Sequence, residues 1–272
     1  MFPLLTLPGE ADIMGFVKLS GKVVLITGAA RRIGRSIALC LAARGAVIAA
    51  HYNTGIREAQ QLKSEIEKQG GEAHLFQSDF SLPAGRQAFS GRPILPIIQK
   101  FLKKVYDEVG RVDVLINNAA IFYPTPFGKV TEQDWDHFLT LNLKTPFFLA
   151  QEIGKKMLAR KSGKIINLVD WTGERPYPDF LPYAISKAGL IAATKGLAKA
   201  LAPHVQVAGI APGPILPAEK ISPARRQKAV AHSLLKRYGS PEDIAETVRF
   251  LIEGTDFITG SIFSVDGGAS VA

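Results

Sequence analysis

Cysteine is almost missing from this chain, which has Cys40 alone among its 272 residues. A disulfide within the chain and a metal site built from several cysteines are therefore excluded, and we expect no bound metal. Cys40 stands at helical spacing from Ile37 and Leu41, which indicates a small core residue. Such sparing use of cysteine is typical of a reducing compartment and favours the cytoplasm.

Long apolar runs are also missing. No stretch is long enough to span a bilayer, and the N-terminal run lacks a basic leader and is broken by Pro3 and Pro8. We therefore expect neither a membrane segment nor a signal peptide. Residues 1–18 are expected to form a loose tail, and residues 19–272 a single domain.

A concentrated basic segment is the third absence. The formal net charge is +9, but the basic residues are scattered, and no nucleic-acid-binding motif accompanies them. The charge therefore favours a small anionic ligand over nucleic acid or a membrane surface.

What the chain does contain is an alternation of short apolar runs with longer amphipathic segments. Seven runs are predicted to be buried strands, at residues 22–28, 46–52, 73–79, 112–118, 164–170, 205–212 and 261–268. Apolar strands separated by helices predict an α/β fold, a single-domain Rossmann fold with a doubly wound, seven-stranded parallel sheet. Residues 81–96 are rich in glycine and proline and are predicted to form a surface loop. Ser240 is expected to cap a helix over 241–253.

The first strand leads into the turn TGAARRIG at residues 27–34. A helix that begins here presents free N–H groups to a phosphate. Gly28 allows the tight turn, and Gly34 allows the helix to pack closely on the strand. Taken alone, the pattern is also compatible with an ordinary strand–helix turn that happens to hold two glycines.

The charges around this turn indicate which nicotinamide cofactor, NAD or NADP, the chain binds. NAD sites place an acidic residue near the end of the second strand, whereas NADP sites use a basic one. From Gly28 to Arg57 the chain has no Asp or Glu, and its arginines there are Arg31, Arg32, Arg35, Arg44 and Arg57. The second strand ends in His51, Tyr52 and Asn53, which can donate hydrogen bonds to a 2′-phosphate. NADP(H) is therefore the predicted cofactor.

Tyr183 and Lys187 stand four residues apart, hence on one face of a helix. A free tyrosine has a pKa near 10, which is about three units too high for efficient proton exchange at neutral pH. A neighbouring ammonium group would lower it. An ordinary surface pair would look the same in the sequence.

These residues stand among six motifs that together resemble the short-chain dehydrogenase/reductase family from about residue 20 to the end. The motifs are TGAARRIG, the NNAA at 117–120, Asn142 in LTLNLK, Tyr183-x-x-x-Lys187, Pro212-Gly213 and FITGSIFSVDGG. The resemblance implies a catalytic set of Asp170, Tyr183, Lys187 and Asn142. Tyr183 would donate the proton, Lys187 would hold the cofactor ribose and lower the tyrosine pKa, and Asn142 would hold a relay water. The cofactor contacts it implies are Gly28, Arg31, Arg32, Ile33, Gly34, His51, Tyr52, Asn53, Asp79, Phe80, Asn118, Ala119, Tyr183, Lys187, Pro212 and Gly213.

Two positions depart from the usual family pattern. Arg32 stands where most members have glycine, and Asp170 where they have serine, thirteen residues before Tyr183. Both departures occur in a subgroup that this chain resembles, the pteridine and dihydromonapterin/dihydrofolate reductases, as does the segment NNAAIFYPTPF. The resemblance implies a substrate site of Phe122, Arg32, Asp170 and Tyr183, with Phe122 stacked on a flat heterocycle.

The sequence therefore predicts an NADPH-dependent oxidoreductase that reduces a C=N bond of a pterin or dihydrofolate-like ring. A carbonyl reductase, such as a 3-oxoacyl-carrier-protein reductase, is the first alternative, because scattered basic charge would suit an acidic carrier protein. A non-catalytic NADP(H)-binding protein is the second. The family resemblance implies a homotetramer with the Tyr183 helix at one interface.

Overall fold

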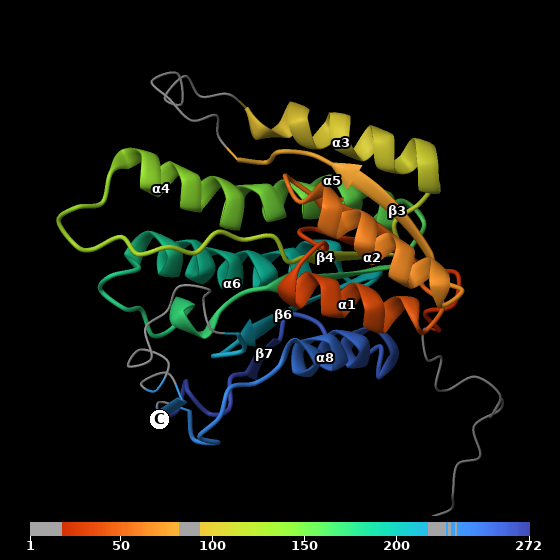
Figure 1. Ribbon diagram of the computed structural model, residues 1–272. Helices are drawn as coiled ribbons and strands as arrows, with labels where there is room; N and C mark the ends of the chain where they lie inside the picture. The colour runs from red at the N-terminus through yellow and green to blue at the C-terminus, as the bar shows by residue number, and fades with distance from the viewer. Residues whose placement is uncertain (1–17, 82–92, 217–226, 228–229, 232) are drawn as a thin grey trace, which may run out of the picture.

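The computed structural model describes residues 18–81, 93–216, 227, 230–231 and 233–272 (Figure 1). Its seven strands form one parallel sheet in the order β3-β2-β1-β4-β5-β6-β7. The predicted sheet and all seven of its strands are confirmed. The strands are β1 Val23–Ile26, β2 Val47–Tyr52, β3 Glu72–Gln77, β4 Val114–Asn117, β5 Gly163–Leu168, β6 Val205–Pro212 and β7 Ile262–Val265.

Helices cover both faces of the sheet (Figure 1). One face packs against α1 (Arg32–Ala42), α2 (Ile56–Lys68) and α8 (Pro241–Glu253), and the other against α3 (Ile94–Val109), α5 (Thr145–Ala159) and α6 (Leu181–Leu201). Strand side chains alternate between the two cores, with Val24 and Ile26 in one and Val23 and Leu25 in the other. The apolar strands therefore reflect burial on two faces, as the sequence indicated.

Local sequence explains several boundaries. The Ser240 hydroxyl accepts a hydrogen bond from the Asp243 amide at 3.3 Å and so caps α8 as predicted. The predicted loop over 81–96 is wrong at its end, because Ile94 already begins α3 with its side chain in the core. Residues 82–92 of that loop and residues 1–17 of the predicted tail lie outside the described residues. Cys40 is only partly buried, at the edge of the core.

The strand order reverses between β1 and β4, where successive crossovers leave in opposite directions. Open α/β sheets bind ligands at the carboxyl ends of the strands beside such a reversal. The turn after β1 and the segments after β4 and β5 lie there, and they carry Gly28, Asn118 and Asp170. In the described part of the chain, no helix is long and apolar enough to cross a membrane, and no cluster of His, Cys, Asp and Glu could hold a metal ion.

Candidate active site

The turn after β1 is packed too closely for side chains. Gly28 has a φ of +65°, and a Cβ on Gly34 would lie 2.2 Å from the Gly28 carbonyl oxygen. The side-chain amide of Asn118 donates to the backbone carbonyls of Thr27 and Gly28 at 2.8 and 3.1 Å, which joins the end of β4 to this turn. Both glycines and Asn118 therefore shape the predicted phosphate turn, because any larger side chain would push α1 off the strand.

Thr27 is a residue of this turn to which the sequence analysis assigned no role. Its hydroxyl oxygen accepts hydrogen bonds from the backbone amides of Asn118 and Ala119, each at 2.9 Å. Thr27 is 3% exposed. It therefore fixes the segment after β4 against the turn after β1, and its place at the head of TGAARRIG was the available signal.

The N-terminus of α1 suits an anion. Among the described residues no side chain caps this helix, and its first turn holds no acidic residue. Arg31 is exposed and forms an ion pair with Glu58 of α2, one residue beyond the acid-free stretch. Arg32 has a φ of +53°, which is unusual for a side chain with a Cβ, and its guanidinium donates to the Leu216 carbonyl at 3.5 Å.

The prediction that the His51 side chain donates to a cofactor phosphate is wrong. His51 is 3% exposed; its Nδ1 accepts from the Gly28 amide at 3.1 Å and its Nε2 lies 3.0 Å from the Ser78 carbonyl. Burial lowers the pKa of His51 to about 4, so the ring is neutral at physiological pH. Phe80, also a predicted cofactor contact, stacks on this ring with centroids 4.6 Å apart and is buried in the core.

The other predicted cofactor residues occupy the same edge of the sheet. Asn53 follows β2, is exposed, and donates to the Asp79 carboxylate at 3.2 Å. A Cβ on Gly213 would lie 2.4 Å from the Asp266 Cα, so this glycine is required by the approach of two backbone segments. The remaining predicted residues, Ile33, Tyr52, Ala119 and Pro212, lie at the N-terminal part of α1 or at the ends of β2, β4 and β6.

Asp170 and Tyr183 are in direct contact. The Tyr183 hydroxyl donates to Asp170 Oδ2 at 2.7 Å. Asp170 Oδ1 accepts from the Thr172 amide at 2.8 Å and from its hydroxyl at 2.6 Å. Asp170 begins the short helix η3 (Trp171–Gly173), and Tyr183 lies in the first turn of α6. The structure thus brings together the two residues that the sequence placed thirteen positions apart.

Lys187 lies one turn further along α6 and is 3% exposed. Its Nζ donates to the Leu168 carbonyl at 2.7 Å and lies 5.8 Å from the centre of the Tyr183 ring. Burial lowers the pKa of Lys187 to about 8, and the Asp170 charge partly opposes this.

The pKa of Tyr183 is shifted in the direction opposite to the predicted one. Burial, and after it the charge and hydrogen bond of Asp170, raise the pKa of this phenol above its usual range. Lys187 does not offset them in this arrangement. Tyr183 therefore keeps its proton at neutral pH, which suits a proton donor better than a base.

Asn142 lies in a π-helical turn, η2 (Thr140–Lys144), between α4 (Glu132–Leu139) and α5. Its amide forms a pair of hydrogen bonds with the Ile121 backbone, at 3.0 and 3.1 Å, and donates to the Ser186 hydroxyl at 3.2 Å. Ser186 in turn donates to the Tyr183 carbonyl at 2.6 Å. The Asn142 side chain therefore links the segment that carries Phe122 to the helix that carries Tyr183.

Phe122 lies on the exposed side of Tyr183. Its ring is 56% exposed and meets the Tyr183 ring edge to face, with centroids 4.8 Å apart. Phe180, which precedes α6 and had no role in the sequence analysis, stacks parallel on Phe122 at 4.7 Å. The structure thus brings Phe122, Asp170 and Tyr183 together, and the aromatic wall is larger than the sequence indicated.

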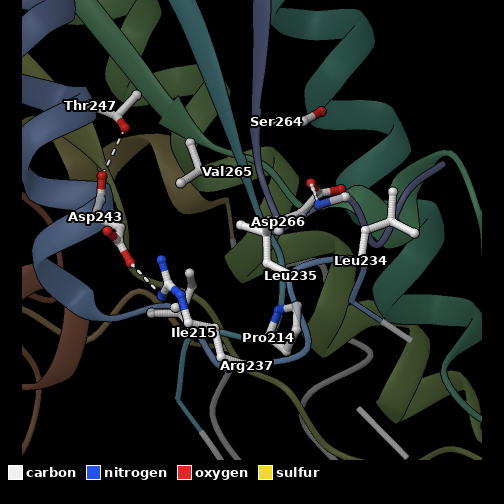
Figure 2. Close-up of a pocket in the computed structure, with 13 residues that line it drawn as sticks. Pro214, Ile215, Leu234, Leu235, Arg237, Asp243, Thr247, Ser264, Val265 and Asp266 are labelled. Atoms are coloured by element: carbon white, nitrogen blue, oxygen red, sulfur yellow. Dashed lines mark hydrogen bonds and ion pairs between the residues drawn. The ribbon is translucent and has the colours of Figure 1, made fainter. Parts of the chain in front are cut away.

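A cavity of about 510 Å³ lies elsewhere, at the ends of β6 and β7 beside the N-terminus of α8 (Figure 2). Pro214, Ile215, Leu235 and Asp266 contribute to its walls. Figure 2 shows Arg237 extended toward Asp243, with 3.9 Å between the charged atoms. None of the residues that line it is a predicted site residue, so we place the chemistry at Tyr183.

Proteins with similar sequences include several 3-oxoacyl-[acyl-carrier-protein] reductases. A 3-oxoacyl-[acyl-carrier-protein] reductase from Synechocystis sp. is 35% identical over 255 residues, which cover 92% of this chain and 97% of the relative. The FabG reductase of the same description from Thermotoga maritima is 33% identical over 262 residues, covering 93% and 99%.

Solved structures give a second group of relatives. FolM alternative dihydrofolate reductase 1 from Brucella canis, complexed with NADP, superposes with a TM-score of 0.83 at 32% identity, covering 94% of this chain and 96% of that one. The Brucella suis protein, also with NADP, gives 0.82 at 31%, covering 93% and 97%. The family model described as short chain dehydrogenase matches residues 22–228. The chain therefore belongs to the short-chain dehydrogenase family of oxidoreductases.

Proposed function

We propose that this enzyme is an NADPH-dependent reductase of a C=N bond in a pterin or dihydrofolate-like ring. The observation that carries the proposal is the Asp170–Tyr183 hydrogen bond of 2.7 Å beneath the exposed ring of Phe122. It combines a proton supply with a flat apolar surface at one place. The structural similarity to the two FolM alternative dihydrofolate reductases supports the same substrate class.

The residues at the turn after β1 fit NADP(H). Gly34 admits no Cβ, the α1 N-terminus is uncapped among the described residues, and Arg31 and Arg32 are exposed cations beside it. The NADP in both Brucella structures supports this cofactor. NADPH, when bound, supplies the hydride. Lys187, in the second turn of α6, and Asn118, directly after β4, would hold the reacting end in place.

Tyr183 would supply the proton. Its raised pKa keeps the phenol protonated until the substrate nitrogen takes the proton. Asp170 lies within hydrogen-bond distance and, once it has itself taken up a proton from solvent, would replace the proton that Tyr183 gives. A C=N nitrogen is basic enough to take this proton before the hydride arrives, which leaves a cation beside the Asp170 carboxylate. A carbonyl oxygen is far less basic and would develop negative charge as the hydride arrives, which the carboxylate would repel. This difference in charge is the physical reason to favour C=N over C=O.

Phe122 would bind the heterocycle. Its exposed ring can stack on a flat aromatic system without further rearrangement of the backbone, because Asn142 holds the preceding residue by two hydrogen bonds. Arg32 lies between the phosphate turn and Leu216 and would contact the polar edge of the substrate.

Reduction of a 3-oxoacyl thioester is the second candidate, and the sequence relatives favour it. Several 3-oxoacyl-[acyl-carrier-protein] reductases are 33–35% identical to this chain over more than nine-tenths of its length. Asp170 is the residue that argues against it, for the electrostatic reason given above.

The test is a parallel assay of the purified protein with NADPH and dihydrobiopterin, dihydrofolate or an acetoacetyl thioester. We expect oxidation of NADPH with a pterin, abolished by Tyr183→Phe. Turnover of the thioester alone would contradict the pterin assignment and support the second candidate.

We also propose a homotetramer. Phe147 of α5 and Ile185 of α6 are 37% and 41% exposed, and Phe250 of α8 is 46% exposed, so apolar side chains stand on two separate helical faces. Light scattering after gel filtration tests this, with the mass of a single chain as the contradicting result.

A further inference from the structure

The two oxygens of the Asp170 carboxylate have different partners. Oδ1 accepts two hydrogen bonds, both from Thr172, whereas Oδ2 accepts one, from Tyr183. Each carboxylate oxygen has two lone pairs. Oδ1 is therefore fully used, and Oδ2 has a lone pair to spare. The two oxygens cannot be equivalent as sites for a proton.

Thr172 is held firmly where it makes these bonds. It is 7% exposed, and the next residue, Gly173, lies directly on α6, where a Cβ would stand 2.9 Å from the Ala188 backbone nitrogen. The short helix η3 is thus fixed against the helix that carries Tyr183. The distances between Thr172, Asp170 and Tyr183 are set by this packing and not by an exposed loop.

Other groups also act on Asp170. Tyr183 and Lys187 face it from α6, and Tyr177 from the segment between η3 and α6, since the Asp170 charge influences the pKa of all three. In the described structure, the hydrogen bond of the Thr172 hydroxyl goes to Asp170 and not to any of these three residues. Replacing that hydroxyl therefore changes one hydrogen bond and leaves the surrounding charges in place.

We propose that Thr172 is a positioning residue that directs the proton which Asp170 takes up during the reaction cycle to Oδ2, the oxygen that faces Tyr183. The inference rests on the proposed function, in which Asp170 supplies the proton that Tyr183 delivers. When the Tyr183 O–H turns to the substrate nitrogen, the protonated Oδ2 donates to the Tyr183 oxygen in place of accepting from it. The Oδ2–H bond then breaks as the Tyr183 oxygen takes that proton, and the Tyr183 O–H bond breaks as the substrate nitrogen takes the Tyr183 proton. The hydride goes to the adjacent carbon, and Asp170 is left as a carboxylate.

Thr172→Val removes the hydroxyl at almost unchanged volume, and Thr172→Ser restores it. In Thr172→Val the carboxylate loses a charge-assisted hydrogen bond. We expect the pH at which the reduction rate declines to rise by about one unit. The maximal rate should fall about tenfold, because protons also occupy Oδ1, with KM within about twofold of wild type. Thr172→Ser should restore the wild-type profile. A lower rate with an unmoved profile in Thr172→Val would overturn the proposal.

A second measurement needs no substrate. A double-mutant cycle in urea compares the stability lost through Thr172→Val in wild type with that lost in Asp170→Asn. We expect a loss at least twice as large in wild type, because only the carboxylate offers a charge-assisted bond. Equal losses would overturn the role of Thr172, even if no tested substrate is reduced. A large coupling without any turnover would support the Thr172 hydrogen bond and contradict the proposed function alone.

Discussion

The Nδ1 atom of His51 accepts a hydrogen bond from the backbone amide of Gly28 at 3.1 Å. The ring stacks on Phe80, and its other nitrogen lies 3.0 Å from the Ser78 carbonyl. A buried neutral imidazole thus joins the ends of β1, β2 and β3 beneath the phosphate turn. The residue does not serve as a surface donor to the cofactor, and its protonation state affects the stability of the turn.

Acid should therefore destabilise the protein through His51. Its pKa in the folded protein is about 4, against 6.5 for a free side chain, so the unfolded chain binds the proton first as pH falls. The contribution of the neutral ring is complete above pH 6.5 and is lost as pH falls toward 4. Between pH 7 and 5 we expect a loss of about 2 kcal/mol in the free energy of unfolding.

Urea denaturation at the two pH values measures this loss. His51→Gln keeps an acceptor and a donor but does not titrate, so its stability should change less between pH 7 and 5 than that of wild type. An equal change in both proteins would contradict the assignment of His51 to the interior.

Gly34→Ala should disrupt the phosphate turn. The new Cβ would lie 2.2 Å from the Gly28 carbonyl oxygen and 2.6 Å from the Asn118 amide nitrogen. We expect a loss of about 2 kcal/mol in the free energy of unfolding and no measurable binding of NADPH. Gly196→Ala in α6 is the matched control, because its Cβ meets nothing within 4 Å. It should stabilise the protein by up to about 1 kcal/mol and leave binding unchanged.

The preference for NADPH should depend on Arg31. Arg31→Ala removes an exposed guanidinium beside the α1 N-terminus, and we expect the Kd of NADPH to rise about tenfold with little change for NADH. Fluorescence titration with both cofactors gives the ratio. Arg35→Ala is the control, since Arg35 lies one turn further into α1 and, like Arg31, is paired with a glutamate of α2, in this case Glu65. An equal rise in the Kd of NADPH and of NADH would show that Arg31 does not bind the 2′-phosphate.

Phe122→Leu should weaken substrate binding more than it slows the chemical step. Leucine keeps apolar bulk but not a stacking face, and we expect KM for a pterin to rise about fivefold with kcat within about twofold. Phe127→Leu, at a ring that is 81% exposed in the same segment, should change neither value. Steady-state kinetics in which both variants behave alike would remove Phe122 from the substrate site.

Much of this arrangement could be predicted from the sequence. Strand runs buried on both faces and the glycines of the first turn depend on local packing, which residue type and spacing record directly. The resemblance to the family also placed Asp170 and Tyr183 in one site, and their hydrogen bond confirms that they are in contact.

The features that the sequence did not predict depend mostly on partners that are distant in the chain. His51 stands at the end of a strand, where the sequence is compatible with either an exposed or a buried side chain. The side chain is buried because it contacts Gly28 and Phe80. The pKa of Tyr183 depends on how completely α6 is covered, which four-residue spacing to Lys187 does not record. Thr172 lies in a helix of three residues and Phe180 in the segment before α6. Neither the Thr172 hydrogen bond nor the Phe180 ring contact therefore had a periodic signal in the sequence.

The most direct test of the central claim is the activity of Asp170→Ser, which converts this position to the residue usual in the family. The ratio of kcat/KM for dihydrobiopterin to kcat/KM for an acetoacetyl thioester is measured with NADPH for wild type and variant. If Asp170 supplies the proton for C=N reduction, pterin turnover should fall at least about a hundredfold, while thioester turnover stays or rises. Full pterin reductase activity in Asp170→Ser would contradict the account.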